Sequence, residues 1–82
     1  MKTIKDRTYS CRHVKERLLE RCQVTLSSEE YDKLCQEFID KKVVIDCIEG
    51  EQVIFQTNFK NKQIKFVWSN NRKLITTALK TI

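Results

Sequence analysis

The spacing of apolar residues changes once along this chain, and that change limits the folds it can adopt. Up to Lys42, apolar residues recur every three or four positions, which is the period of an amphipathic helix. From Val43 onward they alternate with polar residues, as in a strand with one buried face. The chain has no proline and one glycine, so no linker is indicated. We expect a single domain over 1–82 with an α+β fold, in which two N-terminal helices pack on a four-stranded antiparallel β-meander.

Two helices are predicted in the first half of the chain. In the first, at about 10–22, Ser10 is a suitable N-cap. In the second, at about 28–41, Ser27 is followed three residues later by Glu30, which is the spacing of a capping box. Both helices have an apolar stripe, formed by Cys11, Val14, Leu18 and Cys22 in the first and by Tyr31, Leu34, Cys35 and Phe38 in the second.

Four strands are predicted at about 43–48, 52–59, 63–68 and 74–80, because β-rich runs are separated there by polar turn residues. The turn between the first two contains Gly50. Aromatic residues alternate on one face of the sheet, and we expect them to be core and not a base-stacking platform. That core is expected to hold Phe55, Phe66 and Trp68 under Leu18, Leu34 and Phe38.

The four cysteines are widely spaced, with no close pair of the kind that zinc sites use. We expect buried free thiols, with a disulfide as the first alternative and a metal site as the second. No metal or other cofactor is predicted. The residues concerned are Cys11, Cys22, Cys35 and Cys47.

Two expectations concern location. No apolar run approaches the roughly 20 residues needed to cross a bilayer. The N-terminus has a basic start but lacks the apolar stretch of a secretory signal. A cytoplasmic protein with no membrane partner is therefore expected.

Charge is segregated along the chain, whose net charge is +5. Residues 1–22 carry seven basic and three acidic groups (+4), 23–57 carry three and eight (−5), and 58–82 carry six and none (+6). If the two basic ends meet in space, they form a cationic face suited to phosphates or to an acidic protein surface. The alternative is lysines that serve solubility alone.

The only histidine, His13, lies one helical turn before Arg17 and two before Arg21. A metal-free ribonuclease needs a base for the 2′-OH proton, an acid for the leaving oxygen and cations for the phosphate. His13 has a suitable pKa for the acid or base, and arginine binds phosphate oxygens in pairs. The alternative is a solvated histidine on an exposed helix. Further nucleic-acid contacts are predicted from Arg12, Arg21, Lys65, Arg72, Lys73, Thr76 and Thr77.

The run YSCRHVKERLLERCQVTLSSEEYDKL, residues 9–34, resembles the opening of small toxin-like domains of bacteria and their mobile elements. Their layout is similar to the RelE, barnase and colicin ribonuclease superfamily, with a helix of the form H-x-x-x-R-x-x-x-R before a curved sheet. The resemblance implies that His13, Arg17 and Arg21 occupy the family's helix positions. It also implies that Thr76 or Thr77 supplies the last-strand hydroxyl. Many of these toxins carry a stronger acid–base or phosphate residue there, so an inactive relative that only binds is an open alternative.

Three functions follow from these observations. The first is a metal-independent endoribonuclease toxin that cleaves RNA by 2′-OH attack, with His13, Arg17 and Thr76 as catalytic residues. The second is a non-enzymatic phage or mobile-element protein that inhibits a host nuclease or defence factor, or binds nucleic acid through its basic face. The third is a partner-bound domain without chemistry, such as a homodimer with Val67 or Ile75 in its seam.

Overall fold

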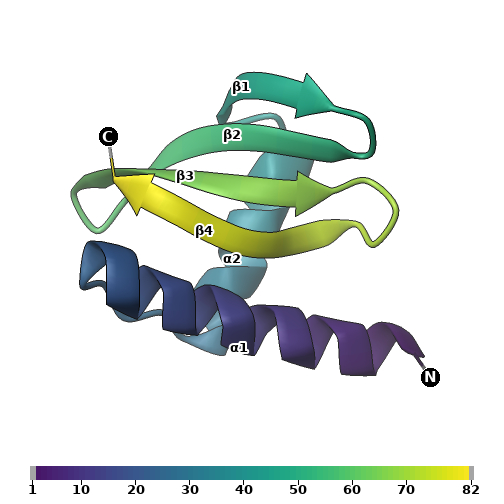
Figure 1. Cartoon of the computed structure of the whole chain (residues 1–82), viewed down its shortest axis with the longest axis horizontal. Coiled ribbons are helices and arrows are strands. Elements are labelled where there is room, and N and C mark those ends of the chain that lie inside the picture. Colours follow the sequence, from purple (N-terminus) through teal and green to yellow (C-terminus); the bar gives the residue numbers. More distant parts are fainter. Residues whose placement is uncertain (1, 82) are drawn as a thin grey trace.

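The computed structural model describes residues 2–81, and the side chains of 9–79. Two helices precede four strands, which confirms the predicted α+β class (Figure 1). The strands form one antiparallel sheet in the order β1-β2-β3-β4. The elements are α1 (Lys2–Cys22), α2 (Ser28–Ile39), β1 (Val44–Glu49), β2 (Gln52–Phe59), β3 (Lys62–Ser69) and β4 (Leu74–Thr81).

The N-terminal end of α1 differs from the prediction. The helix begins at Lys2, and Ser10, predicted as its N-cap, lies inside it with 1% of its surface exposed. The prediction was wrong because the residues before Ser10 include no glycine or proline that would stop a helix. The predicted apolar stripe is confirmed, since Cys11, Val14, Leu18 and Cys22 are all buried.

The start of α2 follows the prediction closely. The Ser27 hydroxyl accepts a hydrogen bond from the Glu30 backbone N–H (3.1 Å), and the Glu30 carboxylate accepts one from the Ser27 N–H (2.8 Å). This reciprocal pair is the predicted capping box. The helix ends at Ile39, earlier than expected, and Lys41 just beyond it has a left-handed backbone with φ 61°.

The core lies between the two helices and one face of the sheet. In the β2–β3 ladder, Phe55 is opposite Phe66, and Val53 is opposite Trp68, so these buried side chains share that face. The Phe38 ring stacks on Trp68 at 4.2 Å between centroids and tilts against Phe55 at 4.9 Å. The predicted aromatic core under the helices is therefore confirmed, with Leu18 and Leu34 in the same cluster.

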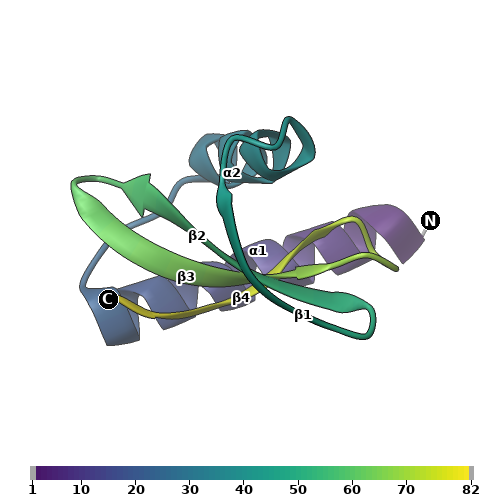
Figure 2. The same cartoon turned by 90° about the horizontal axis from the view of Figure 1, so that it is seen from above.

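The two helices take different positions around the sheet. Figure 1 shows α1 running alongside β4, and Figure 2 shows α2 on one side of the curved sheet. Side chains from both helices donate to carbonyls of β4: Tyr31 Oη to Ile75 (2.6 Å), Arg21 Nη1 to Ala78 (3.2 Å) and Cys22 Sγ to Leu79 (3.9 Å). Backbone acceptors of this edge strand are thereby satisfied by the helices.

The opposite edge, β1, is bare. All six of its residues are exposed. A bulge interrupts its pairing with β2: Ile45 is opposite Phe55 and Cys47 opposite Ile54, which leaves Asp46 as the extra residue. Because Ile48 is opposite Val53, the bulge puts Ile45 and Ile48 on the same face as the buried core. They are nevertheless 48% and 67% exposed, so the other elements leave much of both side chains uncovered.

Candidate functional site

The predicted histidine–arginine stripe is present on α1, but its arginines are engaged within the protein. His13 is half-buried, and its ring stacks with that of the exposed Tyr9 at 6.4 Å. Arg17 forms an ion pair with Glu20 (3.1 Å). Arg21 holds the β4 carbonyl described above, although its side chain is otherwise exposed.

The predicted hydroxyls lie on β4, the strand that runs beside α1. Thr76 and Thr77 are both half-buried, and the Thr76 hydroxyl donates to the carbonyl of Val67 on β3 (3.3 Å). The helix and the strand of the predicted site are therefore neighbours. Within the described residues 9–79, however, no hydrogen bond or ion pair joins His13 to Thr76.

The two basic ends of the chain do meet, because α1 lies beside β4. Several of their lysines are used to hold the chain together. Lys62 Nζ donates to the Cys22 carbonyl at the C-terminal end of α1 (2.7 Å), where a cation also complements the helix dipole. Lys65, a predicted nucleic-acid contact, pairs with Asp46 (2.7 Å). The other predicted cations, Arg12 on α1 and Arg72 and Lys73 in the β3–β4 turn, are exposed.

The cysteines are free thiols. Cys11, Cys22 and Cys35 are buried, as predicted, whereas Cys47 on β1 is exposed. Desolvation, together with the neighbouring Glu49 and Asp46, raises the pKa of the Cys47 thiol above its ordinary value, so this thiol is a poor nucleophile at neutral pH. No group of three or more metal-ligating side chains occurs in the described part of the chain.

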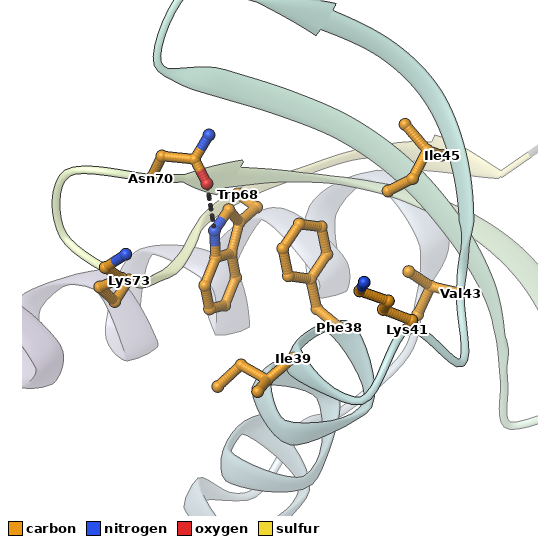
Figure 3. A pocket seen from close by; sticks show the side chains of 8 residues that line it. All are labelled: Phe38, Ile39, Lys41, Val43, Ile45, Trp68, Asn70 and Lys73. Carbon is orange, nitrogen blue, oxygen red and sulfur yellow. Dashed lines mark hydrogen bonds between the residues drawn. The ribbon is translucent and has the colours of Figure 1, made fainter.

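A pocket that sequence reasoning did not predict lies between the C-terminal end of α2, the start of β1 and the β3–β4 turn (Figure 3). Its volume is about 570 Å³. On one side, Trp68 Nε1 donates to Asn70 Oδ1 (3.1 Å), which fixes the indole. The lining is mostly apolar and consists of Phe38, Ile39, Lys41, Val43, Ile45, Trp68, Asn70 and Lys73.

The part of the pocket that is open to solvent is formed mainly by aliphatic side chains, and two lysines are among the lining residues. Trp68 is only 3% exposed and is covered by Phe38, so it offers no open ring for stacking. Ile39, in contrast, is 54% exposed. Figure 3 shows Lys41 and Lys73 on opposite sides of the hollow. This arrangement suits an apolar side chain that has acidic neighbours better than it suits a planar base.

One signal in the sequence points toward the pocket. Ile39 lies immediately after Phe38, outside the apolar stripe of α2, and an apolar run follows within five residues from Val43. Excess apolar residues beyond those a helix can bury indicate a surface with a partner. The convergence of α2 with the β3–β4 turn could not be deduced from spacing.

A smaller hollow of about 250 Å³ opens on the other side of α2, around Lys33, Glu37 and Lys60. Lys60 spans it by donating to the Thr25 carbonyl (2.8 Å) and pairing with Glu30 (3.4 Å). Lys60 is therefore engaged in contacts within the protein. Neither this hollow nor the apolar pocket includes His13.

No helix within residues 2–81 is long and apolar enough to cross a membrane. No protein-family model matches the chain, and neither a curated protein nor a solved structure is significantly similar to it.

Proposed function

We propose that this protein acts by binding another protein, through the pocket between α2 and the sheet. The observation that carries this proposal is the concentration of exposed apolar side chains around that pocket. Ile39 and Ile45 line the pocket and are 54% and 48% exposed, and Ile48, farther along the same face of β1, is 67% exposed. Contiguous apolar surface of this kind is typical of interaction sites.

The chemistry of the pocket indicates what it would bind. Burying one large aliphatic side chain contributes about 1.5–3 kcal/mol, so one apolar anchor from a partner would supply a useful share of the binding energy. Lys41 and Lys73 would attract carboxylates on either side of that anchor. The expected partner is a protein that presents an apolar residue flanked by acidic ones. This is the non-enzymatic alternative raised by the sequence, in which the chain inhibits or engages another protein.

Selection of displayed random peptides on the immobilised protein tests this proposal. We expect enrichment of peptides that combine a large apolar residue with Asp or Glu. Ile39→Asp should abolish their binding, because it puts a charge into the pocket wall. Leu19→Asp is the matched control, since Leu19 is equally exposed (56%) but lies on α1. Failure to enrich any peptide over the bare support, or equal binding by Ile39→Asp, would contradict the proposal.

A metal-independent ribonuclease centred on His13 is the second proposal. It is supported by the position of α1 beside β4, which brings the helix that carries His13 and Arg17 next to the strand that carries Thr76. The test is incubation with labelled RNA and excess chelator, for wild type, His13→Ala and Arg17→Ala, each checked for folding by circular dichroism. Cleavage that leaves 2′,3′-cyclic phosphate and is lost in both folded variants would support it. Intact RNA with the wild type would reject it.

A further inference from the structure

We infer that β1 pairs antiparallel with β1 of a second copy of this chain, which joins the two sheets into one. The inference that the strands pair is supported by the properties of β1 alone and does not depend on the proposed function. Its consequence for the pocket, described below, rests on the proposed function. β1 is the end strand of the sheet and is exposed along its whole length, whereas the other end strand, β4, is covered by α1. An exposed edge presents backbone donors and acceptors to any strand that can align with it.

The sequence of this edge is complementary to itself. Residues 41–51 read KKVVIDCIEGE, which is basic at the start, apolar in the middle and acidic at the end. Antiparallel pairing about the point between Asp46 and Cys47 puts Ile45 opposite Ile48 of the second copy. It also brings the basic start of each strand beside the acidic end of the other. Opposed apolar pairs and opposite charges both stabilise strand pairing.

The charge contact can be assigned to particular side chains. The Glu51 carboxylate already accepts a hydrogen bond from the Ser69 hydroxyl (2.8 Å), so Glu49 is the more available acidic partner. Glu49 is exposed, and the hydrogen bond that it accepts from the Cys47 thiol (3.6 Å) occupies only one of its two carboxylate oxygens. In this register, Lys42 of one copy lies diagonally across from Glu49 of the second copy, within reach of long side chains. Each pairing has two such contacts because the arrangement is symmetric.

The pairing changes the pocket. Antiparallel strands are related by a two-fold axis perpendicular to the sheet, so α2 of both copies would stand on the same face. The two pockets would then face each other across the axis. Ile45 and Ile48 of both copies would form the floor between them, because the bulge puts these residues on the α2 side. If the proposed function holds, the binding site is a groove shared by the two copies, and each copy contributes half of it.

Other seams are less suitable. Val67 and Ile75, expected from the sequence to form a dimer seam, are 8% and 0% exposed, so that prediction is wrong: both side chains are already covered within one copy of the chain. The main competitor is a monomer, since a bulge such as the one at Asp46 is also a way in which proteins protect an edge. The oligomeric state therefore decides the question.

Sedimentation velocity over a range of concentrations is the test. We expect a wild-type dimer that Ile48→Asp converts to a monomer. Lys42→Glu and Glu49→Lys should each raise the dissociation constant at least tenfold, because each places like charges across the axis. An equimolar mixture of these two variants should restore the dimer, since each contact in the mixed pair again joins a positive side chain to a negative one. Lys33→Glu, on the far side of α2, is the charge-matched control and should dimerise like the wild type.

Several outcomes would overturn the inference. A wild type that stays monomeric at every concentration excludes the pairing. A dimer that survives Ile48→Asp, or a mixture of the two charge variants that does not reassociate, excludes this register. The peptide selection separates this inference from the proposed function: a monomer that still binds peptides refutes only the pairing, and a dimer that binds none refutes only the function.

Discussion

The two edge strands of the sheet, β4 and β1, differ in how many contacts they receive from the rest of the chain. β4 lies against α1, and three side chains from the helices bind its carbonyls. β1 receives its backbone pairing from β2 and one ion pair from Lys65, and all its residues are exposed. The difference shows that the chain covers and hydrogen-bonds the β4 edge from within, whereas it leaves the β1 edge exposed to solvent.

Connection lengths explain why the helices protect only one edge. Four residues, 40–43, join α2 to β1, so α2 must end next to the start of that strand. It then crosses the face of the sheet over Phe55 and Trp68 and leaves the outer part of β1 uncovered. α1, placed before α2 in the chain, reaches only the far edge.

The largest expected effect concerns the packing of α1. Leu18 is fully buried, and Leu18→Ala should lower the free energy of unfolding by about 2–5 kcal/mol, through lost contacts and a cavity. Ile48→Ala on the exposed edge should change it by less than about 0.5 kcal/mol when the variants are compared at a protein concentration low enough for the chain to be monomeric. Urea unfolding followed by circular dichroism measures both. Similar losses for the two variants would remove the contrast between the edges.

The hydrogen bonds to β4 give the next effect. Tyr31→Phe leaves the ring in place but removes the donor to the Ile75 carbonyl, a buried contact of 2.6 Å. We expect a loss of about 1–2 kcal/mol of stability, because a buried acceptor loses its partner. Tyr9→Phe, at a residue that is 68% exposed, is the control and should be neutral in the same urea titration.

The ion pair that ties β1 to the rest of the sheet should matter less. Asp46 and Lys65 are both about one-third exposed, so Asp46→Asn should cost less than about 1 kcal/mol. The difference from wild type should shrink further in high salt, which screens partly exposed charges. A loss that is large and independent of salt would show that β1 is held more firmly than its exposure suggests.

The smallest effect is a pH dependence at the start of α2. The Ser27 backbone N–H, followed by Lys60, lowers the pKa of Glu30 below its ordinary value of 4.5. A lowered folded-state pKa stabilises the fold above the unfolded-state pKa, and that stability is lost as the pH falls through the folded value. The difference in stability between wild type and Glu30→Gln should thus be greatest at neutral pH and should fade below about pH 4. Melting temperatures at several pH values would show it, and a constant difference would contradict this cause.

Local chemistry made much of the fold predictable. The capping box at Ser27 and Glu30 and the turn at Gly50 are set by residues close together in the sequence. The start of α1 was missed because a good N-cap residue does not end a helix that can continue through it. Ser10 lies within α1 and is buried, and its burial cannot be predicted from the neighbouring residues in the sequence.

The candidate site was less predictable, for a related reason. The spacing of His13 and Arg17 correctly placed both on one flank of α1, but their partners depend on contacts across the fold. Arg17 pairs with Glu20, and Lys65 reaches Asp46 on a strand two positions away in the sheet. The apolar pocket is formed by segments far apart in the chain. Sequence periodicity could therefore identify the residues as apolar, but it could not predict that they lie next to one another in the fold.

The bulge at Asp46 has a consequence for how β1 can vary through evolution. Because one extra residue sets the phase of the strand, deleting Asp46 would turn the preceding residues to the opposite face. Val43 and Ile45 would then leave the pocket without any change in their identity. Substitutions of one aliphatic residue by another should be tolerated along this strand, whereas a deletion of a single residue should not. Among relatives that keep the pocket, the length of β1 should therefore vary less than its composition.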